Sequence, residues 1–264
     1  MSLLLSIVSL LLIAASLACM ARGARTFNPY ITILLFLLFV LQGEDILEFS
    51  YFYPSLLIAL WGLYIYMKES FFWALFLVSA ASLLYPPFIW LSPLLMVALF
   101  FFESGDKGRK LLKSIWGLLL PYLYLLVYRF VVKGEIKEYF TAKLGVMTDV
   151  GMPSLSYSLP EYALMLCIVV ILFHTLGTVF NNYIERTDRV PLRISGILFL
   201  YALPVFLLFS SDGTNEATLL SGSGFSLLFS FHFNNVRRGM AVKELALLLI
   251  LFLLCGVTCA PDRP

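Results

Sequence analysis

The chain has 264 residues, of which 61% are hydrophobic and only 13% are charged, and its formal net charge is +2. A soluble domain carries about 25% charged residues, and a soluble core cannot absorb apolar runs of this length, whereas a bilayer can. The basic residues form no block dense enough for a nucleic-acid partner, and the four cysteines lack metal-ligand spacing. We therefore predict a single integral membrane domain over residues 1–264, with no cofactor and no metal site.

Ten apolar segments follow one another along the chain, and we predict a helix for each, which makes the fold class all-α. Their approximate bounds are 3–19, 28–42, 49–67, 70–85, 87–102, 112–132, 161–181, 193–210, 217–233 and 243–259. The first segment lacks the basic residues that begin a signal peptide. We interpret it as a retained first span, and a start shortened relative to relatives is the alternative. Several segments are shorter than the roughly 20 residues that cross a hydrocarbon core, so they must thin the bilayer, stand upright or shelter behind neighbours.

The Lys and Arg residues are distributed unevenly between the two sides that alternate along such a bundle. Thirteen of the eighteen fall on one side: Arg22, Arg25, Lys68, Lys107, Arg109, Lys110, Lys113, Arg186, Arg189, Arg193, Arg237, Arg238 and Lys243. The positive-inside rule makes that side cytoplasmic. We predict a polytopic membrane helix bundle of about ten transmembrane helices, with the N and C termini both outward.

The stretch Tyr85-Pro86-Pro87 leaves no room for a loop between the fourth and fifth segments. A residue before proline is biased away from the α region, and a proline at the first position of a helix loses no intrahelical bond. We predict that Tyr85 ends one helix and that the prolines start the next, in a tight turn at the outer interface.

The sharpest polar cluster is QGEDILEFSYFYP at 42–54, which contains Glu44, Asp45 and Glu48 on the outward side, followed by Tyr51 and Tyr53. Glu44 and Glu48 are four residues apart and would share a helix face. The three acids are candidate catalytic residues, since such carboxylates serve as a general base or hold a cation. The alternative is a solvated helix start with acids near the positive end of the dipole.

Two further ionisable groups fall inside apolar segments. Arg129 lies in the sixth segment, where it would either snorkel to the outer interface or pair with a carboxylate or lipid phosphate. His174 lies near the middle of the seventh, where it is either functional or hydrogen-bonded to a neighbouring helix. Arg129, His174, Tyr51, Tyr53 and Tyr128 are our candidates for binding a substrate or lipid.

These groups suggest one outward site if the third and sixth segments are neighbours. Arg129 would then lie within salt-bridge distance of Glu44, Asp45 or Glu48, or share a pocket with one of them. Tyrosines 51, 53, 85 and 128 would surround the pair.

Four stretches occur in a familiar order: ARTFNPYITILLF (24–36), FSYFYPSLLIALWGLYIYM (49–67), ALFLVSAASLLYPPFIWLSPLLMVALFFF (74–102) and WGLLLPYLYLLVYRFVVKG (116–134). Over about the first half of the chain the sequence resembles an uncharacterised family of polytopic inner-membrane proteins of Bacteroidetes bacteria. The resemblance implies a multi-pass location in the bacterial inner (cytoplasmic) membrane. It supplies no established activity and no site residues.

Three functions are compatible with this sequence, and whether the protein is an enzyme stays open. The first is a non-enzymatic subunit in assembly of the cell envelope, with membrane lipids and a membrane protein subunit as its partners. The second is a glycosyltransferase-like enzyme that acts on a polyprenyl-linked substrate at the outer leaflet through the acids at 44–48, which is an analogy only. The third is a transporter, suggested by His174 and by prolines at 93, 121 and 204 that could mark broken helices.

Overall fold

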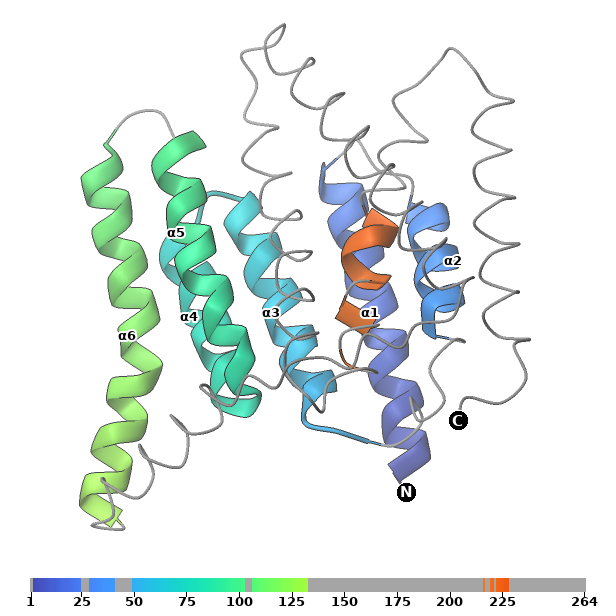
Figure 1. Cartoon of the computed structure of the whole chain (residues 1–264), viewed down its shortest axis with the longest axis horizontal. Coiled ribbons are helices and arrows are strands. Elements are labelled where there is room, and N and C mark those ends of the chain that lie inside the picture. The colour runs from blue at the N-terminus through green and yellow to red at the C-terminus, as the bar shows by residue number, and fades with distance from the viewer. Residues whose placement is uncertain are drawn as a thin grey trace, which may run out of the picture.

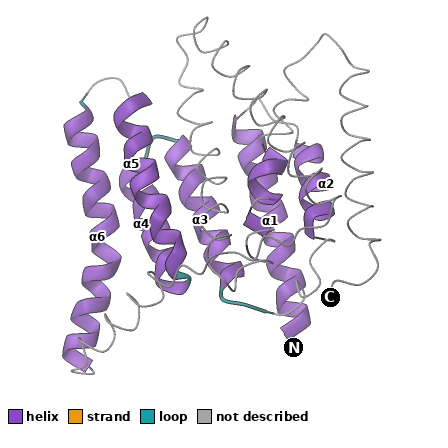
Figure 2. Ribbon diagram, in the orientation of Figure 1, coloured by secondary structure: helices purple, strands orange, loops and turns teal. Residues whose placement is uncertain are grey.

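The computed structural model describes residues 2–24, 29–40, 49–102, 106–132, 216, 219–220 and 222–227. The described residues contain helices and no strand (Figure 2). The labelled helices are α1 (Ser2–Ala24), α2 (Pro29–Val40), α3 (Phe52–Met67), α4 (Phe71–Leu84), the 3-10 helix η1 (Pro86–Trp90), α5 (Leu91–Phe102) and α6 (Lys107–Val132). The all-α fold class is therefore confirmed for this part of the chain.

Two of these helices are long and apolar enough to cross a membrane. They are Leu3–Arg22 within α1 and Lys107–Val131 within α6. Helices α2 to α5 have 12 to 16 residues each and are shorter than a full hydrocarbon core requires. The predicted segments 161–181, 193–210 and 243–259 lie outside the described residues, and 217–233 is described only at 219–220 and 222–227.

The start of α6 differs from the prediction. The sequence places the sixth helix at 112–132, but α6 begins at Lys107, where the amide of Lys110 donates to the carbonyl oxygen of Asp106 at 3.1 Å. Lysine and arginine are good helix formers, so the basic segment extends the helix instead of forming a loop. The basic side chains are thereby fixed on the faces of a helix.

The helices run side by side, with α6 at one edge and α2 at the other (Figure 1). Helix α4 packs between α3 and α6, while α1 packs against α2 and α3. The continuous segment formed by η1 and α5 returns along the bundle and packs against α4 and α6. Helices α1, α3 and α5 end, and α4 and α6 begin, at the same end of the bundle, which is the upper end in Figure 1.

Two glycines allow α4 to approach its neighbours closely. A Cβ atom on Gly62 of α3 would lie 2.9 Å from Cγ2 of Val78 and 3.1 Å from the carbonyl oxygen of Ala74. A Cβ atom on Gly117 of α6 would overlap the carbonyl oxygen of Phe72 in α4. Small residues that let helix backbones meet are typical of interfaces between membrane helices.

Hydroxyl groups link α4 to both neighbours. Ser55 Oγ of α3 donates to the carbonyl oxygen of Ala81 at 2.8 Å, and Ser79 Oγ donates to that of Leu118 in α6 at 2.8 Å. Ser82 Oγ and the hydroxyl of Tyr122 form a further hydrogen bond between α4 and α6. Hydrogen bonds between helices stabilise membrane bundles by about 0.6 kcal/mol each on average.

The chain continues as helix through Pro121, which lies inside α6. Proline has no amide hydrogen for the carbonyl of Gly117, four residues earlier. A polar group from a neighbouring helix often makes up for this loss, and here Ser79 donates to the next carbonyl, that of Leu118. The expected broken helix at Pro121 is therefore wrong.

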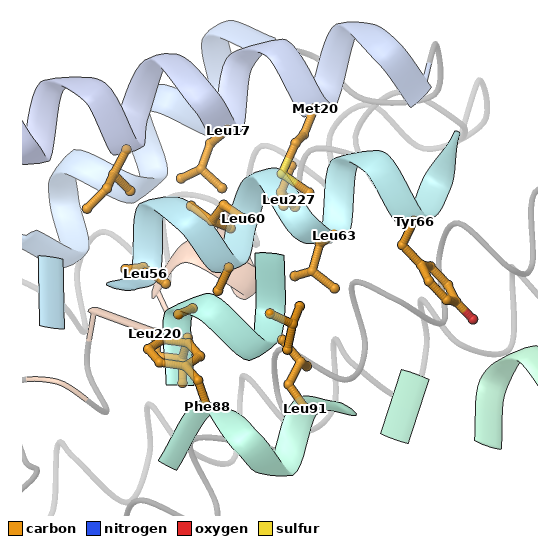
Figure 3. Packing of buried hydrophobic residues seen from close by; sticks show 14 of the residues in the cluster. Leu17, Met20, Leu56, Leu60, Leu63, Tyr66, Phe88, Leu91, Leu220 and Leu227 are labelled. Carbon is orange, nitrogen blue, oxygen red and sulfur yellow. The ribbon is translucent and has the colours of Figure 1, made fainter. Parts of the chain in front are cut away.

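One apolar cluster joins these helices (Figure 3). Side chains from α1, α3, the continuous segment η1–α5 and residues 219–220 and 222–227 interdigitate there. The labelled members are Leu17, Met20, Leu56, Leu60, Leu63, Tyr66, Phe88, Leu91, Leu220 and Leu227. The cluster attaches a segment far along the sequence to the first five helices.

Candidate functional site

The turn between α4 and η1 has the predicted form. Helix α4 ends at Leu84, Tyr85 is extended with φ −129° and ψ 102°, and Pro86 and Pro87 occupy the first positions of η1. The extended backbone at Tyr85 follows from the steric demand of the next proline ring. The first turn after the break is a 3-10 helix, and α5 proper begins at Leu91.

The hydroxyl of Tyr85 donates a hydrogen bond of 2.7 Å to Oε2 of Glu216. The two residues are 131 positions apart, so this bond holds a distant segment against the end of α4. Tyr53, in the first turn of α3, is 3% exposed, and the charge of the same carboxylate acts on its hydroxyl. We call Tyr53, Tyr85 and Glu216 the carboxylate site.

Aromatic rings surround the carboxylate site. The ring of Phe52 lies 5.2 Å from that of Tyr85 in an edge-to-face arrangement, and Phe88 lies 5.7 Å from Tyr85. Phe52 and Phe88 are 5.9 Å apart, and both are buried. These spacings are in the favourable range for aromatic pairs, so the tyrosine rings are held by packing before any ligand binds.

Burial raises the pKa of the Tyr85 hydroxyl well above its ordinary value of 10.0, and the hydrogen bond and charge of Glu216 raise it further. Both causes favour the neutral phenol. Tyr85 therefore keeps its proton at every physiological pH and acts as a hydrogen-bond donor to the carboxylate.

A carboxylate in these surroundings has two chemical uses. It can fasten two segments together, or it can bind a cation or a proton and exchange it. The rings of Tyr53 and Tyr85 would assist a cation by their negative faces. Neither use requires the carboxylate to attack a substrate.

The structure separates the predicted tyrosines. Tyr51 precedes α3 and is 70% exposed, whereas Tyr53 is buried beside Glu216. The ring of Phe49 lies between them, 6.4 Å from Tyr51 and 6.3 Å from Tyr53. Tyr51 is therefore exposed, Tyr53 buried and Tyr85 half-buried, and the predicted ring of tyrosines around Arg129 stays a prediction.

Arg129 lies in the last turn of α6 and is half-buried, while Tyr128 beside it is 49% exposed. Arg129 follows Ser114, Gly117 and Pro121 on the buried stripe of α6, so it is on the face that packs against α4. Its predicted partners Glu44, Asp45 and Glu48 lie outside the described residues, as does His174. The pairing of Arg129 with one of these acids stays a prediction.

The sequence pattern does not single out Glu216 as a site residue. The sequence carries one signal that points to it, because Glu216 directly precedes an apolar segment on the same side of the predicted bundle as Tyr85. Nothing in the pattern reveals that the two meet. Pairing residues across 131 positions requires the packing order of the helices.

The opposite end of the bundle carries positive charge. Arg22 lies in the last turn of α1, Lys68 follows α3, and Lys107, Arg109, Lys110 and Lys113 belong to the start of α6. We call these six residues the basic end. Acidic neighbours at this end are Glu69 and Asp106.

Comparison of the chain with protein-family models, with curated proteins and with solved structures gave no match. The resemblance to inner-membrane proteins of Bacteroidetes bacteria therefore stays a prediction.

Proposed function

We propose that the protein is an integral protein of the bacterial inner membrane that serves as a non-enzymatic subunit in assembly of the cell envelope. It crosses the membrane about ten times, with both termini outward. Its surroundings are membrane lipids and at least one further membrane protein subunit.

The distribution of charge supports this orientation. The six residues of the basic end belong to three separate parts of the chain, yet the helix ends that carry them all lie at the same end of the bundle (Figure 1). The carboxylate site lies at the far end of α4. The positive-inside rule then assigns the basic end to the cytoplasm.

Labelling of single cysteines tests the orientation. In a background without native cysteines, Tyr51→Cys should react with an impermeant maleimide from the periplasm, and Lys68→Cys should be protected until the membrane is opened. Both positions are exposed, so accessibility within the protein is matched. Faster labelling of Lys68→Cys from the periplasm would contradict the proposed topology.

The observation that favours a subunit is the exposure of Tyr124 on α6, which is 76%. Helix α6 has 26 residues and is about 39 Å long at 1.5 Å per residue. If its basic start lies among the headgroups, the roughly 30 Å hydrocarbon core begins near Ser114, and Tyr124 lies close to its middle. A helical side chain leans toward the N-terminus, which keeps the hydroxyl of Tyr124 deep.

A phenol at this depth has no water to bind, and an unsatisfied hydroxyl in hydrocarbon costs several kcal/mol. A neighbouring transmembrane helix would supply an acceptor for it. Phe130, which is exposed in the second half of α6, is an aromatic residue of the kind enriched in protein interfaces. We therefore assign the exposed face of the second half of α6, around Tyr124, to a partner subunit.

Photo-crosslinking in native membranes tests this assignment. A benzoylphenylalanine at position 124 should yield an adduct with one membrane protein, which mass spectrometry of a pull-down in mild detergent identifies. The control position is Tyr30 of α2, which is 75% exposed on another helix. Lipid adducts alone at both positions would overturn the subunit proposal.

A second candidate function, cation-coupled transport, is favoured by the carboxylate site alone. Proteoliposomes loaded with a pH-sensitive dye would report proton flux under a Na⁺ or K⁺ gradient. Transport through Glu216 predicts flux that is lost in Glu216→Gln and kept in Asp106→Asn, a change of an exposed acid at the basic end. If the wild-type protein shows no flux, the role of Glu216 is to hold two segments of the chain together. The glycosyltransferase alternative depends on Glu44, Asp45 and Glu48.

A further inference from the structure

Positive and apolar residues share one exposed stripe along the first half of α6. Arg109, Lys113, Trp116 and Leu120 are spaced by four, three and four residues, which places them on one helix face. All four are exposed, Trp116 by 54% and Leu120 by 43%. The stripe therefore begins with two cations and continues as an apolar surface.

Three lysines of the basic end make contacts with aromatic residues. Lys68 Nζ lies 5.5 Å from the ring centroid of Tyr64, and Lys110 Nζ lies 5.8 Å from that of Phe71. Lys107 Nζ donates to the carbonyl oxygen of Phe100 at 3.0 Å. The basic end therefore presents an ordered positive field, although Glu69 and Asp106 reduce its net charge.

We propose that Arg109 and Lys113 bind the phosphate of an anionic phospholipid whose acyl chain lies along Trp116 and Leu120. Arginine forms paired hydrogen bonds with phosphate, and lysine adds a point charge. Polybasic segments at the cytoplasmic surface attract anionic lipids by about 1 kcal/mol per residue. This inference rests on the proposed membrane location.

The length of the stripe suits a lipid of one leaflet. Half of the hydrocarbon core is about 15 Å, which is about ten residues of helix at 1.5 Å per residue. A chain that starts at Lys113 would end just before Tyr124. Lipid in the inner leaflet and a partner helix at Tyr124 therefore occupy successive halves of α6.

Brominated lipids test the site because bromine quenches tryptophan fluorescence on contact. The full chain is reconstituted in nanodiscs that contain either brominated phosphatidylglycerol or brominated phosphatidylcholine in a background of unlabelled lipid. The signal of Trp116, one of four tryptophans, is obtained by difference from Trp116→Phe. We expect phosphatidylglycerol to quench Trp116 at about thirtyfold lower mole fraction than phosphatidylcholine, because two cations contribute about 2 kcal/mol together.

The double variant Arg109→Gln/Lys113→Gln should abolish that preference. The matched control is Arg22→Gln/Lys68→Gln, which removes the same charge from exposed positions of the same end and should keep it. Equal loss in both double variants would mean a diffuse field without a site. If millimolar inorganic phosphate abolishes the preference, Arg109 and Lys113 bind a free anion instead of a lipid.

The quenching experiment distinguishes failure of the lipid site from failure of the proposed membrane location. Quenching of Trp116 by both lipids at equal mole fraction would refute the lipid site and leave the membrane location intact. No quenching of any tryptophan by either lipid would overturn both.

Discussion

The two ends of α4 solve the problem of placing charge beside apolar helices in different ways. At its start, several basic residues lie at the perimeter, and the ammonium groups of Lys68 and Lys110 lie over aromatic rings. At its end, the carboxylate of Glu216 is drawn onto a half-buried tyrosine and surrounded by rings. Among the described residues, the first end displays several charges at the surface, whereas the second encloses one carboxylate.

This difference determines what each end can contribute. Charges at an exposed perimeter interact weakly with one another and are screened by salt, so they are suited to meeting a large anionic surface. A single carboxylate with a fixed donor interacts strongly because little water competes. Stability should therefore depend on the carboxylate site, and lipid contact on the basic end.

The largest effect is expected from a substitution that forces α4 and α6 apart, because both ends of α4 depend on this packing. Gly117→Ala would place a methyl group against the carbonyl oxygen of Phe72, which is backbone and cannot rotate away. We expect a loss of about 3 kcal/mol or more, at or above the upper end of the usual range for overpacking, from forced separation of α4 and α6, measured as a lower thermal midpoint in detergent.

Gly108 is the matched control, because a Cβ atom there meets nothing within 4 Å. Gly108→Ala should be neutral or stabilise the protein by up to about 1 kcal/mol, since glycine disfavours helix interiors. Gly62→Ala should fall between the two, because its closest neighbour is the side chain of Val78. A neutral result for Gly117→Ala would mean that α4 and α6 pack less closely than described.

The next effect isolates the carboxylate site. Tyr85→Phe removes the donor to Glu216 and should cost about 1.5–3 kcal/mol, the usual range for a hydrogen bond to a charged group. Because the two side chains are partners, Tyr85→Phe and Glu216→Gln should be non-additive in a double-mutant cycle. Additive thermal shifts would show that the two groups do not depend on each other.

Alkaline pH should also lower the stability of the folded protein, because the proton on Tyr85 is held more tightly in the folded state. The pKa of Tyr85 is raised in the folded protein, so above about pH 10 the unfolded chain releases the proton while the folded chain keeps it. The folded state then binds more protons, and stability falls as pH rises. Wild-type stability should decline more steeply above pH 10 than that of Tyr85→Phe.

The control for the pH experiment is Tyr51→Phe, which changes an exposed tyrosine near the same end of the bundle. Its decline should parallel that of the wild type. If Tyr85→Phe declines as steeply as the wild type, the buried phenol is not the group responsible.

The sequence predicted the helices better than their contacts. The bounds of α2, α3 and α4 agree with the predicted segments within three residues, because apolar runs and the prolines after Tyr85 mark them directly. Charged residues mark helix ends less reliably, since Lys107 to Lys110 continue as helix. The meeting of Glu216 with Tyr85 depends on which helices are neighbours, and one sequence does not contain that information.

The smallest expected effect concerns the turn at the basic end. Glu69 has φ 65°, a left-handed conformation that favours glycine. The amides of Glu69 and Ser70 donate to the carbonyl oxygens of Tyr66 and Ile65, at 2.9 and 3.3 Å. This is the pattern of a Schellman C-cap, which normally carries glycine at the position of Glu69.

Glu69→Gly would relieve about 1 kcal/mol of backbone strain but would add about 0.4–1 kcal/mol of unfolded-state entropy. We expect a net gain of a few tenths of a kcal/mol, which corresponds to about one degree in the thermal midpoint. Glu69→Ala keeps the strain and loses the carboxylate, so it should be less stable than both. If Glu69→Gly is destabilised as well, the carboxylate of Glu69 contributes more than the strain costs. The basic end would then depend on a fixed acid, as the carboxylate site does, and the contrast between the two ends of α4 would be one of degree.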